Sequence, residues 1–237
     1  MEEKKYKVFL LPYAGSSVMT YSPWKNYIPG DIELVFLEMQ GRGIKSEQTM
    51  SADFEFVVNQ LYKEITSEIT DEKYVIFGHS MGSLLAYELY YKIASEGFKM
   101  PEEIILSGRL SPELCIHMKK VSEYPENDFL KEVAVYGGLP EEIKINKELR
   151  DYFVPIMRAD FKLIENYTYT NRHEMINCNL TIFYGNKDYS TPSDEIVEWR
   201  KKAGKKFSCI EFPGGHFFCM DKDNIKDIAT HLEKTFR

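Results

Sequence analysis

The chain has 237 residues, enough for one large α/β domain or two small ones, and its 43% hydrophobic content is typical of a globular protein. Its 37 acidic residues outnumber its 30 basic ones, giving a net charge of −7, which argues against a nucleic-acid partner because such partners need a basic face. No stretch is long enough to span a membrane, and the apolar run at residues 8–11 is too short for a secretory signal. We therefore predict a cytoplasmic protein with no membrane and no nucleic-acid partner.

Six short apolar runs predict strands that are buried on both faces, as in a parallel sheet covered by helices. They are residues 7–11, 33–39, 74–77, 103–107, 180–184 and 209–212. Helical spacing of apolar residues occurs in residues 54–69, 81–94 and 224–236. This alternation predicts an α/β fold with a doubly wound, mostly parallel central sheet and helices on both faces.

The interval from about residue 111 to residue 172 breaks this alternation, because it contains no convincing buried strand. Helical fragments are predicted at residues 127–136, 148–157 and 160–166, with prolines and the pair Gly137-Gly138 between or within them. A helical insertion between two core strands predicts a lid over a functional site; the alternative is an ordinary extra helical layer. We predict a single domain over residues 1–237 that carries this insertion.

The segment Gly78-His79-Ser80-Met81-Gly82 lies between a predicted strand and a predicted helix. In this context the G-x-S-x-G pattern is typical of a nucleophile elbow, a tight turn that exposes the serine hydroxyl. Glycine is needed on both sides because a Cβ atom there would meet the strand or the helix. We predict Ser80 as a catalytic nucleophile; the alternative is a glycine-rich turn with a helix-capping serine.

A serine nucleophile needs a general base, and the base needs a carboxylate that orients it. After a nucleophile elbow the expected chain order is Ser, then Asp or Glu, then His. His216 follows the last predicted strand in a loop with Gly214 and Gly215, and functional groups collect at the carboxyl ends of parallel strands. We predict His216 as the base; the alternative is a packing or capping histidine. Of the others, His79 is inside the elbow, His117 and His173 are at the edges of the insertion, and His231 is in the last helix, where we expect it to be solvated.

Asp188 is the first carboxylate after the fifth predicted strand, and we predict it as the residue that orients the imidazole. Asp194 and Glu195 are rivals. However, Thr191 and Pro192 predict a helix start, with Thr191 as N-cap and proline at the first helical position. The helix dipole then explains the two later acidic residues. The alternative role for Asp188 is a turn aspartate that bonds its own backbone.

An oxyanion hole needs two fixed N–H donors. The amide of Met81, directly after the nucleophile, is one candidate. The other is expected in the loop at residues 12–17, after the first strand, where the amides of Tyr13 and Ala14 are candidates. The alternative for this loop is a plain Gly/Ser turn.

With these residues placed, the chain resembles the type II thioesterases that accompany nonribosomal peptide and polyketide synthetases. The matching stretches recur in order over nearly the whole chain, so that the set is specific although each member is weak. They are Leu11-Pro12-Tyr13-Ala14-Gly15-Ser16, Met39-Gln40-Gly41-Arg42-Gly43, Phe77-Gly78-His79-Ser80-Met81-Gly82, Leu106-Ser107-Gly108, Met157-Arg158-Ala159-Asp160-Phe161, Phe183-Tyr184-Gly185-Asn186-Lys187-Asp188 and Pro213-Gly214-Gly215-His216-Phe217-Phe218. The chain departs from the family at Ser16, where a second glycine is usual, and at Gln40, where a proline is usual. Neither departure removes a catalytic group.

The resemblance implies an α/β-hydrolase fold and hydrolysis of acyl or aminoacyl groups from the phosphopantetheine arm of carrier domains, which clears mis-primed carriers. Ser80, Asp188 and His216 would form the triad, and the amides of Met81 and Ala14 the oxyanion hole. The implied partners are acylated carrier domains of a synthetase. No metal or diffusible cofactor is implied, since the phosphopantetheine belongs to the substrate. We expect a monomer, and we expect its four cysteines, which show no CxxC pairing, to be reduced thiols.

Two other functions stay open at this point. A general acyl-CoA thioesterase or carboxylesterase would use the same three residues. A non-catalytic scaffold would keep the fold only to bind a carrier domain or a synthetase. The presence of Ser80, Asp188 and His216 together argues against the scaffold, because a binding protein has no need for all three.

Overall fold

The computed structural model describes residues 5–115 and 119–237, and its centre is a six-stranded sheet whose neighbouring strands are all parallel. The strands are β1 (Tyr6–Leu11), β2 (Ile32–Phe36), β3 (Lys73–His79), β4 (Glu103–Ser107), β5 (Asn179–Gly185) and β6 (Phe207–Phe212). Their spatial order is β2-β1-β3-β4-β5-β6, so the chain steps outward from β1 to β2 and then crosses back to β3. Because the strands are parallel, the loops at their carboxyl ends gather along one edge of the sheet.

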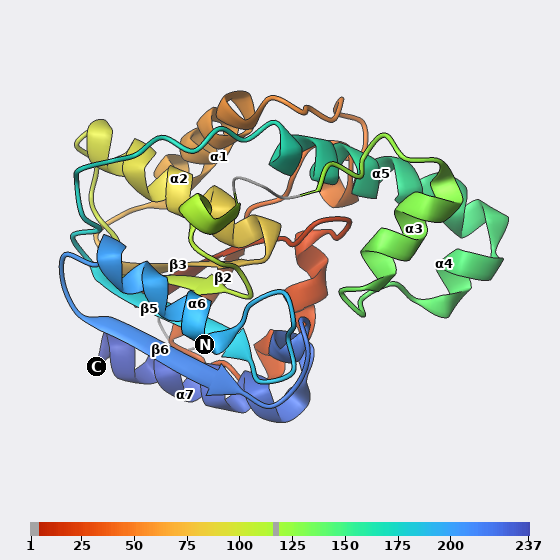
Figure 1. Ribbon diagram of the computed structural model, residues 1–237. Coiled ribbons are helices and arrows are strands. Elements are labelled where there is room, and N and C mark those ends of the chain that lie inside the picture. The colour runs from red at the N-terminus through yellow and green to blue at the C-terminus, as the bar shows by residue number, and fades with distance from the viewer. Residues whose placement is uncertain (1–4, 116–118) are drawn as a thin grey trace.

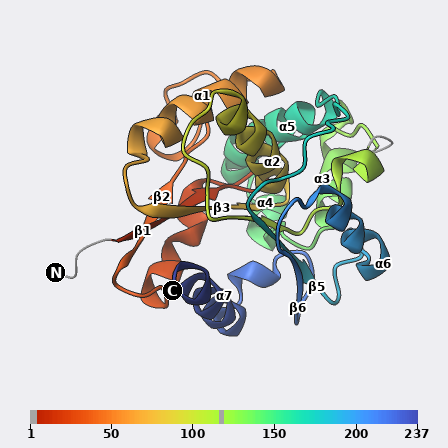
Figure 2. The same cartoon turned by 90° about the vertical axis from the view of Figure 1, so that its left-hand side faces the viewer.

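Helices cover both faces of this sheet. α1 (Phe54–Glu68) and α2 (Met81–Ser95) lie on one face and α7 (Lys222–Phe236) lies on the other (Figure 1), and Figure 2 shows the same layers after a quarter turn. The strand β3 divides its side chains between two cores, since Ile76 packs with α1 and α2 whereas Val75 and Phe77 pack with α7. Burial on both faces explains the continuous apolar runs of the sequence, and the predicted α/β fold is confirmed.

The helices α1 and α7 each begin where an aspartate N-cap precedes an apolar stripe. The side chain of Asp53 accepts the N–H of Phe56 at 3.0 Å to start α1, and Asp221 starts α7 in the same way. Such a cap stabilises a helix by about 1 kcal/mol. Burial of the stripe contributes more, because each fully buried Leu or Ile side chain is worth roughly 1.5–3 kcal/mol.

Three α-helices of the described residues lie between β4 and β5 and extend beyond the sheet (Figure 1), and we call them the helical insertion. They are α3 (Glu126–Ala134), α4 (Glu141–Ile145) and α5 (Lys147–Glu165). The insertion has a small core of its own, which includes Phe129, Ile143 and Met157. Further along α5, Leu163 belongs to the main core instead, so this helix joins the two parts of the molecule.

The two predicted helices at residues 148–157 and 160–166 are one helix, α5, which continues through Pro155. Proline inside a helix removes a hydrogen bond and costs about 3 kcal/mol. The apolar side chains of Val154, Met157 and Leu163, all buried, offset that cost by packing. The predicted second strand at residues 33–39 is observed as β2, which ends at Phe36, where its register with β1 reaches Leu10, next to the last residue of β1.

The remaining helical segments are short. They are α6 (Ser193–Ile196) and 3₁₀ turns at Val18–Asn26, Gly43–Lys45, Pro112–Cys115, Val197–Lys202 and Phe218–Met220. Within the described ranges, no helix has the length and apolar character needed to cross a lipid bilayer.

Candidate active site

Ser80 lies at the turn between β3 and α2, with φ 54° and ψ −111°. Among the described residues it is the only non-glycine residue with a positive φ, a conformation that costs on the order of 1–3 kcal/mol and clusters at functional sites. A Cβ on Gly78 would lie 2.0 Å from the carbonyl oxygen of Gly82. A Cβ on Gly82 would lie 2.6 Å from the carbonyl oxygen of Leu11. Both glycines are therefore required, and the strand-turn-helix context of the elbow is confirmed.

The end of β4 holds this strained turn in place. The backbone N–H of Ser80 donates to the carbonyl oxygen of Ser107 at 2.8 Å. The buried hydroxyl of Ser83 accepts the N–H of Ser107 at 2.9 Å and lies 2.8 Å from the carbonyl oxygen of Gly78. The elbow is thus bonded to its neighbouring strand from both sides, which keeps the serine in its unusual conformation.

Asp188 and His216 come from the loops after β5 and β6 and form a buried pair, with side chains that are 3% and 5% exposed. Nδ1 of His216 lies 2.7 Å from Oδ2 of Asp188. The other carboxylate oxygen accepts the backbone N–H of Ser190 at 3.0 Å and its hydroxyl at 2.6 Å. Since Nδ1 faces a carboxylate, it carries the proton, and Nε2 is left as the acceptor that a general base requires.

The charge of Asp188 follows from these contacts. Burial alone would raise its pKa, because burial disfavours the charged carboxylate. Hydrogen bonds from His216 and Ser190, together with the charge on His216, outweigh burial and lower the pKa of Asp188 to about 2. The carboxylate is therefore ionised at neutral pH and suited to stabilise an imidazolium.

Ser80 and His216 line the same cavity, but their side chains, both described, form no hydrogen bond with each other. The structure thus brings the predicted acid and base together and places the predicted base and nucleophile on the wall of one cavity. Contacts between a serine hydroxyl and its base are often long in the absence of substrate and shorten when it binds. The geometry is compatible with a Ser-His-Asp triad, whose catalytic role stays a prediction.

Two amides are available at the predicted oxyanion hole. Met81 is the first residue of α2, so its N–H has no partner one turn earlier in the helix. In the loop after β1, the N–H of Gly15 donates to Asp160 at 2.7 Å and the N–H of Ser16 donates to the carbonyl oxygen of Tyr13 at 3.2 Å. Both candidates in this loop, Tyr13 and Ala14, line the cavity, and Ala14 lies directly beside the held Gly15.

The cavity has a volume of about 1010 Å³ and lies between the sheet edge and the helical insertion. Apolar side chains of the insertion form one wall: Leu139, Ile143, Leu149, Phe153, Met157 and Phe161. The insertion also touches the base, because the ring of Tyr136 lies 5.2 Å from that of His216. Gly138 packs so closely on Phe217 that a Cβ there would lie 1.9 Å from the ring. The insertion therefore covers the site, as predicted for a lid, whereas its gating role stays a prediction.

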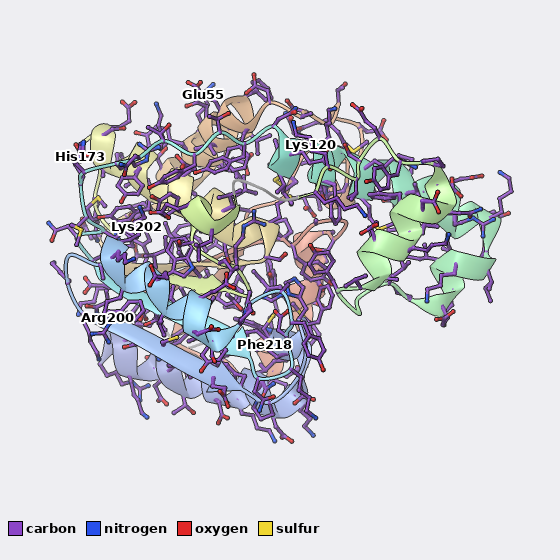
Figure 3. The ribbon with its side chains drawn as sticks, viewed as in Figure 1. Glu55, Lys120, His173, Arg200, Lys202 and Phe218 are labelled. Carbon is purple, nitrogen blue, oxygen red and sulfur yellow. The ribbon has the colours of Figure 1, made fainter. Side chains whose placement is uncertain are left out.

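The other candidate residues do not reach the pair. Asp194 and Glu195 are exposed in the first turn of α6. His173 is exposed and lies at one edge of the molecule, well apart from Phe218, two residues after His216 (Figure 3). His117 lies outside the described residues.

His79 is fully buried inside the elbow. Its Nδ1 lies 2.9 Å from the hydroxyl of Ser107, and its ring lies 5.0 Å from that of His216. Burial, and to a lesser extent the nearby His216, lowers the pKa of His79 well below 6.5, so the ring is neutral. Its position predicts a packing role behind the base.

Two expectations were wrong. His231 is not freely solvated: its side chain is only 19% exposed, and its Nε2 lies 3.0 Å from Oε2 of the buried Glu103, because this face of α7 packs against the start of β4. Thr191 does not cap α6, which begins one residue later with Pro192 as its N-cap. The N–H of Thr191 instead donates to the carbonyl oxygen of Asp188 at 3.2 Å and closes the turn that holds this acid.

The described residues contain three free cysteines and no group of possible metal ligands. Cys178, Cys209 and Cys219 are free, and burial raises the pKa of Cys178 to about 12 and that of Cys209 to about 11, so both remain protonated thiols. Within residues 5–115 and 119–237, no three His, Cys, Asp or Glu side chains are grouped as metal ligands. That the reaction needs no metal or cofactor stays a prediction.

Ser190 is a candidate functional residue that the sequence did not reveal. Its hydroxyl holds the acid and lies 3.2 Å from Nδ1 of His216. A signal was present, because a serine two residues after an aspartate is typical of a turn closed by the aspartate side chain. The spacing alone does not say that the base approaches the same hydroxyl.

Comparisons with known proteins agree with this geometry. Over 214 residues the chain is 28% identical to the gramicidin S biosynthesis protein GrsT of Aneurinibacillus migulanus, covering 90% of this chain and 83% of that protein. Over 239 residues it is 25% identical to the medium-chain S-acyl fatty acid synthase thioesterase of Homo sapiens, covering 98% and 88% of the two chains. The crystal structure of ClbQ from the colibactin NRPS/PKS pathway superposes with a TM-score of 0.90 at 30% identity, covering 98% of this chain and 97% of ClbQ.

A family profile decides the assignment. Residues 6–236 match the thioesterase domain, which is nearly the whole chain. The parallel sheet, the strained serine between β3 and α2 and the Asp188–His216 pair are what an α/β-hydrolase of this kind requires. The chain belongs to the thioesterase domain family and is a thioester hydrolase of the serine α/β-hydrolase type.

Proposed function

We propose that this chain is a type II thioesterase that hydrolyses acyl or aminoacyl thioesters from the phosphopantetheine arm of carrier domains in a nonribosomal peptide or polyketide synthetase. One observation carries the proposal: Ser80 and His216, which is paired with Asp188, line one cavity of about 1010 Å³ beneath a helical insertion. The names of GrsT, a gramicidin S biosynthesis protein, and of ClbQ, from an NRPS/PKS pathway, support this substrate class. A monomer in the cytoplasm stays a prediction.

In the first half of the reaction, Oγ of Ser80 attacks the thioester carbonyl carbon while Nε2 of His216 takes its proton. The carbonyl oxygen becomes an oxyanion, which the amides of Met81 and Ala14 stabilise; one such donor is worth about 3 kcal/mol. Asp188 stays ionised and stabilises the imidazolium. When the tetrahedral intermediate collapses, the carbon–sulfur bond breaks and the imidazolium protonates the departing thiolate of the phosphopantetheine.

In the second half, water enters where the thiol left. Nε2 of His216 takes a proton from this water as its oxygen attacks the ester carbonyl, and the same two amides hold the new oxyanion. Collapse breaks the bond to Oγ of Ser80, which regains its proton from the imidazolium. The products are the free acid and the unloaded carrier, so a mis-primed carrier becomes available again.

The substrate class is tested by comparing rates on an acyl-loaded carrier domain, the matching acyl-CoA and a nitrophenyl ester. We expect the loaded carrier to have the highest kcat/KM, because carrier contacts outside the cavity add binding. A rate on the carrier no better than on the free ester would favour a general carboxylesterase.

Covalent labelling separates an enzyme from a binding scaffold. We expect a fluorophosphonate to label the wild type at Ser80 and to leave Ser80→Ala unlabelled. A wild type that is not labelled would favour the scaffold.

The gating role of the insertion is tested by hydrogen exchange. We expect the amides around Gly137 and Gly138 to exchange faster than those of β3, since they lie beyond the sheet in a turn. Exchange as slow as in the central strands would contradict a mobile lid.

A further inference from the structure

A buried ion pair joins the helical insertion to the sheet edge. Nη1 of Arg42 donates to Oδ2 of Asp160 and Nη2 donates to Oδ1, each at 2.5 Å. The side chains of this pair are only 3% and 2% exposed. Arg42 lies in the segment after β2, whereas Asp160 lies in α5, 118 residues later. The two-point contact fixes their relative position.

The same pair holds the loop after β1. Oδ2 of Asp160 accepts the N–H of Gly15 at 2.7 Å, and Nη1 of Arg42 donates to the carbonyl oxygen of Ser16 at 3.2 Å. Met157, one turn earlier in α5, closes on this loop, since a Cβ on Gly15 would lie 2.5 Å from its Cγ. The φ of Gly15 is 81°, so glycine alone fits there without strain.

We propose that Arg42 and Asp160 are positioning residues for the oxyanion hole and act through Gly15 on the amide of Ala14. The inference rests on the proposed function. The carbonyl group of Ala14 and the N–H of Gly15 belong to one planar peptide unit. Holding that N–H against Asp160 therefore fixes the peptide that follows Ala14, and only two dihedral angles separate it from the Ala14 N–H.

The charge of the pair suits this role. A lone carboxylate near the site would oppose the negative charge that develops on the thioester oxygen. Two-point pairing with Arg42 cancels the charge of Asp160 while both oxygens remain held. A buried ion pair adds little net stability compared with apolar side chains of the same volume. Its presence here therefore favours a role in the geometry of the loop.

The test uses two variants and a control. Arg42→Met/Asp160→Leu replaces the pair by apolar side chains of similar size. Arg42→Lys keeps the charge but loses the two-point contact. The control is Asp151→Asn, since Asp151 forms an exposed ion pair with Lys147 on the same helix.

For each protein we measure kcat and KM on an acyl-loaded carrier domain. We also measure Kd for an alkyl boronic acid, which forms a tetrahedral adduct with a serine nucleophile, and for the matching alkyl amide, which does not. The boronic acid reports on the oxyanion hole, whereas the amide reports on the acyl cavity. Thermal unfolding identifies the variants that remain folded.

We expect kcat to fall 10- to 100-fold in the double variant and about fivefold in Arg42→Lys, less than the loss of a whole oxyanion donor. Affinity for the boronic acid falls in the same proportion, while KM and affinity for the amide stay within twofold. Asp151→Asn matches the wild type.

Wild-type kcat and boronic acid affinity in a folded variant would overturn the proposal, and Arg42→Lys serves this purpose where the double variant fails to fold. A parallel loss of boronic acid and amide binding would also overturn it, because the whole site would then be disturbed. Failure of the proposed function is distinct, since the wild type itself would not hydrolyse the loaded carrier.

Discussion

Replacing Asp188 by Asn tests the predicted catalytic role of the Asp188–His216 pair with almost no change of shape. Ser190 presents two donors, its N–H and its hydroxyl, to one oxygen of the carboxylate. In Asp188→Asn the amide oxygen takes that place, so the NH₂ group faces Nδ1 of His216. Because NH₂ donates, Nδ1 must accept, and the ring proton moves to Nε2. The nitrogen that must take the proton of Ser80 is then blocked.

We expect kcat to fall about 10⁴-fold, as the wrong tautomer does in other Ser-His-Asp enzymes, which corresponds to roughly 5.5 kcal/mol. Stability changes less. The pKa of Asp188 is lowered from 3.8 to about 2, so the folded state gains at most about 2.4 kcal/mol from its charge. This stability is present above pH 3.8 and is lost as the pH falls towards 2. At pH 7 the variant therefore unfolds at a lower temperature but remains folded.

Mass spectrometry of an acyl-loaded carrier measures turnover, and circular dichroism at pH 7 confirms that the variant is folded. The matched control is Asp194→Asn, an exposed aspartate in the first turn of α6, which we expect to keep wild-type turnover. Turnover of Asp188→Asn within tenfold of the wild type would refute its role as the residue that orients the base.

Three further outcomes are expected. In Gly138→Ala the new Cβ pushes on the ring of Phe217, and kcat should fall at least tenfold with little change in Tm. The comparison is Gly137→Ala, whose Cβ meets nothing within 4 Å but whose φ is positive. This variant should lose about 1–2 kcal/mol of stability and keep nearly the wild-type kcat. Because the pKa of His79 is lowered in the folded state, the folded protein loses stability as the pH falls below 6.5, by up to about 1.4 kcal/mol per pH unit. The free energy of unfolding in urea, measured at pH 7.5 and 5.5, should therefore change less with pH in His79→Asn than in the wild type. An equal change in both proteins would contradict the buried neutral state of His79. Ser190→Ala removes one hydrogen bond to the acid and should lower kcat about tenfold, with unchanged kcat arguing against a positioning role.

The sheet could be predicted from the sequence because its signal is local. Strands buried on both faces leave continuous apolar runs, and all six runs coincide with observed strands to within three residues at each end. The errors arise where distant packing decides. Pro155 predicts the end of a helix because proline lacks a backbone N–H, but α5 continues through it, since the side chains on either side are buried. His231 lies in α7 among polar residues of the sequence, yet its side chain is paired with Glu103 of strand β4.

The positions of Ser80, Asp188 and His216 could be predicted because the parallel topology of the sheet brings the ends of their strands together. Each follows a parallel strand, so all three lie at the same edge of the sheet. No comparable rule brings Arg42 to Asp160, since one lies in a loop and the other within a helix of the insertion. The conformation of Ser190 likewise depends on the approach of the base from a separate loop.

The helices of the helical insertion differ in what they contact. α5 is anchored by Leu163 in the main core and by Asp160, whose carboxylate holds Gly15. The buried side chains of α3 and α4 pack in the small core of the insertion, and the turn between these helices touches the site at Gly138. A movement of α5 would break the Gly15 hydrogen bond and disturb the proposed oxyanion hole. If the insertion opens to admit a substrate arm, we therefore expect α3 and α4 to move, because their movement leaves the hydrogen bond between Asp160 and Gly15 intact.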